Sequence, residues 1–200
     1  MVDYFLILQD KYGSLYYTDA EIATFLNRAQ MDEVTAFLPI SGDQLNIELN
    51  ANTIARIAPL LFRVETLAMD VDGIVLKADL DAELTQPVMR VLAVSYNNLP
   101  VKYRRYNNWY TYLNNTFKAP SASAPKMYEK ADSYVFAPAS IAADLVFLGV
   151  RYPITMLDNG TVDCELPDLF HNDIVSRALS FAGVGSRDQM LSELKKLNTV

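Results

Sequence analysis

The chain has 200 residues, of which 51% are hydrophobic and only 20% are charged, and its net charge is −7 at neutral pH. Average domains carry about 25% charged residues, so we expect part of the surface to be covered by protein contacts rather than by water. The single cysteine excludes an internal disulfide. No stretch approaches the ~20 apolar residues that a membrane-spanning helix requires, and we expect no membrane partner.

The charge is unevenly distributed along the sequence. The segment from Leu84 to Tyr128, called the basic segment below, contains six basic residues and no Asp or Glu. The rest of the chain holds the other 11 basic residues and all 24 acidic residues, a net charge of −13. A uniform hydrated surface would not produce this separation, so the pattern predicts two surfaces of unlike charge.

The first 63 residues are predicted to be helical. Thr18 and Glu21 have the spacing of a capping box, and Pro59 predicts a kink or an early stop in the helix that contains it. A strand through Phe5–Leu8 is the alternative to the first helix. The expected helices are Val2–Tyr12, Thr18–Leu38 and Asn52–Leu61.

The middle of the sequence changes to the period of β-strands. Asp72-Gly73 is a strong hairpin signal, and Asn159-Gly160 marks a second turn. The predicted strands, in chain order, are two over Val64–Leu80, then Met89–Tyr96, Tyr134–Phe136, Leu145–Tyr152, Ile154–Leu157 and Thr161–Glu165.

Residues 97–125 interrupt this β region. They contain three Asn-Asn pairs, many aromatic residues and most of the basic residues of the basic segment, and they end in small, loop-forming residues. We expect a long loop that projects from the sheet. Because its aromatic side chains should not stay in water, contacts with other chains should order it.

The C-terminal part returns to helical spacing. Pro167 suits the first turn of a helix, Gly183 can end that helix, and Ser186 with Gln189 has the spacing of a capping box for a last helix. The order of helices, strands and helices predicts an α+β fold, with terminal helices packed beside a central antiparallel β-sheet or β-sandwich.

We expect one domain over residues 1–200. Its N-terminal helices occupy 1–63, its β region occupies 64–165 with the excursion at 97–125, and its C-terminal helices occupy 166–200.

Few residues are available for catalysis or metal binding. The sequence has one histidine, His171, and one cysteine, Cys164, whereas a zinc site needs about four well-spaced ligands. The two could pair as a base and a thiolate, which leaves a hydrolase as the least favoured hypothesis. The seven glycines form neither a phosphate-binding loop nor a dinucleotide fingerprint. We predict that the protein is not an enzyme and that it needs no cofactor or metal.

The segment Tyr96–Phe117 is the best candidate for a binding site. Tyr, Trp and Arg dominate protein-interface hot spots, while basic groups interleaved with aromatics also suit single-stranded nucleic acid. We favour a protein partner because the acidic remainder of the chain would repel phosphate, and we keep a single-stranded nucleic-acid-binding module as the alternative. The candidate partner-binding residues are Lys102, Arg104, Arg105, Tyr106, Trp109 and Tyr110.

Three parts of the sequence resemble structural proteins of tailed phages. Residues 18–30, TDAEIATFLNRAQ, resemble the opening helix of phage neck and tail-ring proteins. Residues 124–128 (APKMY), 134–138 (YVFAP) and 146–153 (VFLGVRYP) resemble the strand series of structural proteins from crAss-like podoviruses. Residues 165–178, ELPDLFHNDIVSRA, resemble their C-terminal helix, which follows a short Leu-Pro turn.

The resemblance implies a virion protein that forms a ring in the head-to-tail connector or tail, around the DNA channel. Its expected partners are copies of itself in a cyclic homo-oligomer, expected to be a dodecamer, and the portal protein or other neck and tail rings. Genomic DNA would pass through the channel without specific binding. The protein would be made in the cytoplasm of the host bacterium, and it would carry no catalytic residues.

Overall fold

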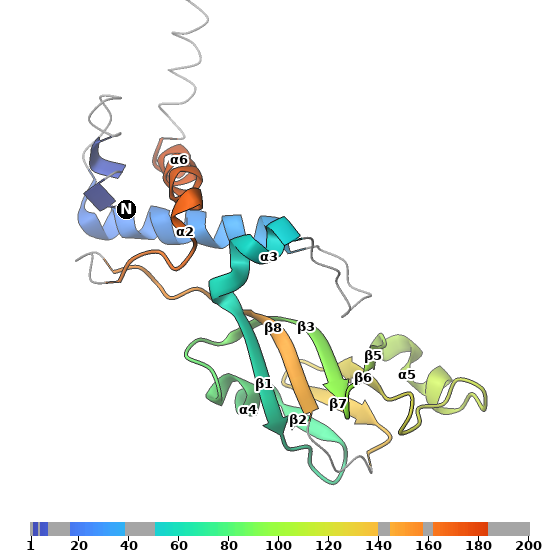
Figure 1. Ribbon diagram of the computed structural model, residues 1–200. Coiled ribbons are helices and arrows are strands. Elements are labelled where there is room, and N and C mark those ends of the chain that lie inside the picture. Colours follow the sequence, from blue (N-terminus) through green and yellow to red (C-terminus); the bar gives the residue numbers. More distant parts are fainter. Residues whose placement is uncertain are drawn as a thin grey trace, which may run out of the picture. The chain divides into compact units, whose positions relative to one another are not determined.

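The computed structural model describes residues 2–3, 5–7, 17–38, 51–139, 145–157 and 162–183. The chain divides into two compact units (Figure 1). The helical unit combines the two chain ends, Met1–Leu38 and Pro153–Val200, and the β unit is Pro39–Tyr152. Helices together with mainly antiparallel sheets confirm the predicted α+β class. That one domain spans residues 1–200 stays a prediction.

The helical unit is built on α2 (Asp19–Phe37) and α6 (His171–Ala182), the latter preceded by the short helix η2 (Asp168–Phe170). The predicted capping box at the start of α2 is confirmed: the Thr18 side chain accepts from the backbone N–H of Glu21, and the Glu21 carboxylate accepts from that of Thr18 at 2.8 Å. Gly183 is the C-cap of α6, also as predicted.

Helices from the two ends of the sequence pack against each other, as predicted. The buried apolar residues of this contact are Ile22, Leu26, Ala29 and Val34 on α2 and Ile174, Val175 and Ala178 on α6. Residues 2–3 and 5–7 are also helical. The remainder of the predicted first helix, the Asn159-Gly160 turn and the predicted last helix lie outside the described residues.

The described part of the β unit begins with α3 (Ala51–Ile57) and η1 (Ala58–Leu60). The α-helix ends two residues before Pro59, which lies in η1, so the early stop is confirmed. Two four-stranded sheets follow. The first has the order β1 (Leu61–Leu67), β8 (Leu145–Arg151), β3 (Val88–Tyr96) and β4 (Leu99–Pro100), and all its neighbours are antiparallel. The second has the order β2 (Ile74–Leu76), β7 (Ser133–Ala137), β6 (Lys126–Glu129) and β5 (Lys102–Tyr103).

The two sheets form a sandwich around one apolar core. Side chains alternate between the faces of a strand, so every second residue of β7 and β8 faces inward. Phe147 of the first sheet meets two rings of the second, Tyr134 at 5.5 Å and Phe136 at 6.2 Å between centroids. The antiparallel pattern of the second sheet is broken only between β5 and β6, which are parallel.

The Asp72-Gly73 turn is present, but the predicted hairpin is wrong. Gly73 has a φ of +77°, and its N–H donates to the carbonyl oxygen of Asp70. The strands on either side belong to different sheets, because β1 pairs with β8 and β2 with β7. The turn therefore carries the chain from one layer of the sandwich to the other.

Two further strand predictions are wrong. Lys77–Ala82 forms the helix α4, which buries Leu80. The described residues of 154–157 and 162–165 form no strand. Side chains of the helical unit bind this backbone instead: the Asn27 amide donates to the Met156 oxygen at 3.0 Å and accepts from the Met156 N–H at 2.7 Å.

Much of the expected projecting loop is folded. Asn97 and Asn98 both have positive φ, 45° and 62°, and connect β3 to β4 in a two-residue hairpin. The chain then forms β5 and the helix α5 (Tyr106–Leu113). The expectation of a long loop is corrected for these residues, since α5 packs on β6.

Gly149→Ala should destabilise the β unit by about 1–3 kcal/mol, because the site is overpacked. An added Cβ would lie 2.6 Å from a ring carbon of Phe62 and would collide with the carbonyl oxygen of Arg90 on the other neighbouring strand. Chemical denaturation measures the effect. The control Leu148→Met, at a half-exposed neighbouring position, should cost less than about 0.5 kcal/mol. Equal stability of the two variants would contradict the packing described.

Candidate functional site

The register of β5 and β6 places basic side chains together. Lys102 lies directly beside Lys126 in the parallel pair, and paired residues face the same side of a sheet. Arg104 follows two residues after Lys102, and its N–H donates to the Met127 oxygen at 2.8 Å, which continues the pairing. Three positive side chains and Tyr128 therefore share one face, while Met127 points into the sandwich core.

Helix α5 covers part of this face with aromatic side chains. Trp109 is 5% exposed, and its ring centroid lies 4.5 Å from that of Tyr128. The Tyr106 ring also packs on Tyr128, at 5.5 Å. Ala137 and Val135 of β7 complete this small second core. The sheet is thus buried on both faces at β6.

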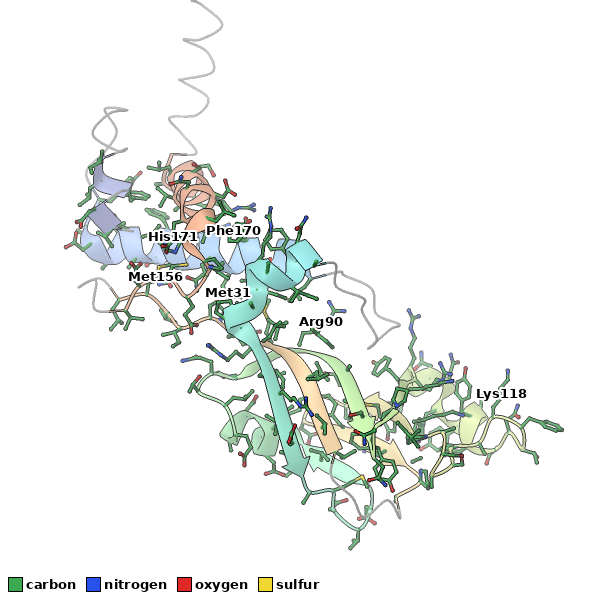
Figure 2. All side chains as sticks on the ribbon, in the orientation of Figure 1. Met31, Arg90, Lys118, Met156, Phe170 and His171 are labelled. Carbon is green, nitrogen blue, oxygen red and sulfur yellow. The ribbon has the colours of Figure 1, made fainter. Side chains whose placement is uncertain are left out.

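Tyr112 near the end of α5 contacts two cations. The guanidinium carbon of Arg104 is 4.7 Å from the centre of its ring, and the ammonium nitrogen of Lys126 is 5.0 Å from it. Burial and the positive charges of Arg104, Lys102 and Lys118 lower the pKa of Lys126. Lys118, labelled in Figure 2, follows α5 in the sequence.

These residues define a continuous candidate site, the basic aromatic surface. Its members are Lys102, Arg104, Arg105, Tyr106, Tyr110, Tyr112, Phe117, Lys118 and Lys126. Among the predicted site residues, Lys102, Arg105, Tyr106 and Tyr110 are exposed and Arg104 is half-buried. Trp109 was predicted to bind a partner, but its side chain is buried against Tyr128 and packs beneath the surface instead.

Four members are absent from the predicted site residues, namely Tyr112, Phe117, Lys118 and Lys126. Phe117 is 98% exposed. It lies in the turn region after α5, and it belongs with Tyr112 to the candidate segment Tyr96–Phe117. No signal in the sequence indicates that Lys126 lies close to Tyr112 and Arg104, since this proximity depends on the β5–β6 pairing.

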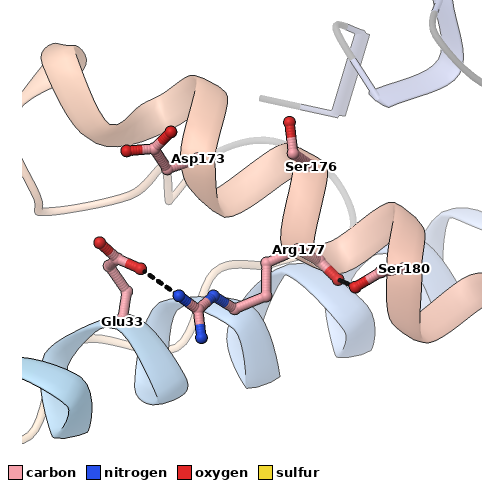
Figure 3. A pocket seen from close by; sticks show the side chains of 5 residues that line it. All are labelled: Glu33, Asp173, Ser176, Arg177 and Ser180. Carbon is pink, nitrogen blue, oxygen red and sulfur yellow. Dashed lines mark hydrogen bonds and ion pairs between the residues drawn. The ribbon is translucent and has the colours of Figure 1, made fainter.

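An open pocket in the helical unit is a second candidate (Figure 3). It is lined by Glu33 of α2 and by Asp173, Ser176, Arg177 and Ser180 of α6. Arg177 Nη2 reaches across to Glu33 Oε2 at 2.8 Å, and the Glu33 side chain is 5% exposed. The buried charge is therefore paired within the protein, and the ion pair ties the two helices together. Nothing here is poised for chemistry.

The geometry weakens the hydrolase hypothesis. Burial raises the pKa of the Cys164 thiol to about 11, so this thiol is protonated at neutral pH. His171, labelled at the start of α6 in Figure 2, has its Nε2 2.9 Å from the Leu166 carbonyl oxygen and its Nδ1 3.6 Å from Asp168. Across the described residues, no group of three or more His, Cys, Asp or Glu side chains is arranged to hold a metal ion.

No helix in the described part of the chain has both the length and the apolar character needed to cross a membrane.

Trp109→Ala should destabilise the β unit by about 3–5 kcal/mol, because a buried indole leaves a cavity. Tyr110→Ala removes the neighbouring aromatic ring, which is 63% exposed, and should cost less than about 0.5 kcal/mol. Urea denaturation of both variants measures the difference. Equal losses would show that Trp109 is not the packing residue described here.

Cys164 should be alkylated at pH 8 about 100-fold more slowly in the folded protein than in urea. The thiolate is the reactive form, and raising the thiol pKa from 9.0 to about 11 lowers its population at pH 8 by that factor. The single cysteine makes iodoacetamide labelling, followed by mass spectrometry, a direct measurement. A folded-state rate equal to the unfolded rate would contradict a buried, protonated thiol.

No protein-family model and no curated protein matches the chain.

Proposed function

We propose that the protein is a non-enzymatic structural component of a tailed-phage virion, which forms a ring in the head-to-tail connector or tail around the DNA channel. The observation that carries the proposal is that one chain presents two surfaces of opposite charge. The basic aromatic surface lies on the β unit, and the helical unit is acidic. The phage assignment itself depends on the sequence resemblance.

The acidity of the helical unit is pronounced. Its described residues 17–38 and 162–183 contain eight Asp or Glu residues and only two arginines. Asp19, Asp168 and Asp173 are exposed. Opposite charges across an interface steer approach and orientation, so the helical unit of one copy suits the basic aromatic surface of the next.

Two unlike surfaces favour a ring over a symmetric dimer. A heterologous contact joins one surface of a subunit to a different surface of its neighbour, and repetition of that contact closes a ring when the rotation allows it. The exposed rings of Tyr106, Tyr110 and Phe117 supply apolar contact area, and the charges supply orientation. We propose a dodecamer in contact with the portal protein or other neck and tail rings, located in the virion and made in the bacterial cytoplasm.

A second candidate function is binding of single-stranded nucleic acid. Tyr106 and Tyr110 are exposed beside basic residues, as stacking platforms require. We rank it lower because Trp109, the largest ring of the segment, is buried and cannot stack on a base. The acidic helical unit would also repel phosphate.

The direct test is Lys102→Glu combined with Lys118→Glu. Both residues are exposed, so the variant should stay folded, while the reversed charge should abolish formation of oligomers. Sedimentation velocity measures the assembly state, and circular dichroism measures folding. Rising salt should weaken assembly of the wild type, since exposed charges are screened beyond about 8–10 Å.

The matched control is Arg63→Glu combined with Lys130→Glu, which makes the same change in net charge at exposed positions outside the basic aromatic surface. It should assemble like the wild type. Normal assembly of the Lys102/Lys118 variant would refute the proposed contact. Binding of the wild-type monomer to oligothymidylate, lost in that variant, would favour the second candidate.

A further inference from the structure

We propose that Arg104, Tyr112 and Lys126 form a carboxylate-binding site at the centre of the basic aromatic surface. Its occupant is an Asp or Glu side chain from the helical unit of a second copy of this chain. The identity of the occupant rests on the proposed function, whereas the site itself rests on two cations that lack an anion within the described structure.

Arg104 supplies the first observation. Its backbone is fixed by the hydrogen bond to Met127, and its guanidinium lies against the Tyr112 ring. The Nε atom is buried and has no hydrogen-bond acceptor among the described residues. A buried donor without an acceptor is costly, and a guanidinium fork matches the two oxygens of a carboxylate.

Lys126 supplies the second observation. The residue is only 6% exposed, and lysines are rarely buried without an ionic partner. Within the described residues no ion pair to Lys126 is formed. Glu129, three residues further along, forms an ion pair with Lys77 instead. The ammonium contacts the Tyr112 ring. Burial lowers the pKa of Lys126 most, and among the neighbouring charges Arg104 lowers it most.

Both cations lie against the same aromatic ring. Both lie within 5.0 Å of the centre of the Tyr112 ring, and no Asp or Glu occurs anywhere from Leu84 to Tyr128 to neutralise them. Arg104 is half-buried, so part of this residue is open to a partner's side chain. A bound carboxylate would relieve the repulsion between the two charges.

A carboxylate fits better than a nucleic-acid backbone. Single-stranded nucleic acid binds along a groove in which cations and stacking rings alternate. Here two cations lie against a single ring, which suits one anion better than a row of phosphates. The acidic surface available in every copy is the helical unit of the same chain.

The variant Lys126→Met tests the site, because it should raise the stability of the monomer and weaken its self-association. Removing an unpaired buried charge should stabilise the monomer, so its urea midpoint should rise. Self-association should weaken about 10-fold to 100-fold, because the carboxylate loses a charged partner. A residue with only a structural role would not move the two measurements in opposite directions. Lys130→Gln removes an exposed charge outside the basic aromatic surface and should change association less than about 3-fold.

The carboxylate-binding site and the ring can be tested separately. If the wild-type chain does not self-associate, the ring proposal fails, and the site is tested with a fluorescent ten-residue polyglutamate peptide. Peptide binding that is lost in Lys126→Met and retained in Lys130→Gln supports the site. Equal binding to the wild type and Lys126→Met, or binding of oligothymidylate but not of the peptide, overturns it.

Discussion

Lys102 lies beside Lys126 because β5 runs parallel to β6 at the edge of an otherwise antiparallel sheet. This pairing is the constraint on which the rest of the basic aromatic surface depends. It fixes Arg104 over the same face and turns Met127 inward to the sandwich core. Like charges held side by side are unfavourable, and within the described residues Lys126 forms no ion pair that would compensate for this arrangement.

Aromatic side chains of α5 cover the face of the second sheet that points away from the sandwich core. Trp109 and Tyr106 of α5 rest on Tyr128, and the helix brings Tyr112 against two of the cations. Cation–π contacts offset part of the cost of these charges. The residual positive potential faces outward on the β unit, while the helical unit carries the excess of carboxylates, with the buried Glu33 paired to Arg177. A chain with two such surfaces is suited to contact between copies.

Local signals predicted the parts of the fold that depend on neighbouring residues. The capping box of Thr18 and Glu21 and the stop at Pro59 follow from chemistry within one helical turn. The second strand predicted within Val64–Leu80 ends early, because a run as short as Lys77–Leu80 fits both a strand and the short helix α4. The β5–β6 register joins residues more than twenty positions apart, so Lys126 could not be assigned to the candidate site from the sequence, whereas Lys102, Arg104 and Tyr106 were.

The central claim is that copies join through unlike, oppositely charged surfaces, and a charge-swap mixture tests it most directly. One variant carries Lys102→Glu with Lys118→Glu, and the other carries Asp168→Lys with Asp173→Lys, all at exposed positions. Each variant alone should sediment as a monomer. An equimolar mixture should recover oligomers larger than a dimer, since each reversed surface meets a reversed partner. A mixture that stays monomeric, or assembly of either variant alone like the wild type, would contradict the account.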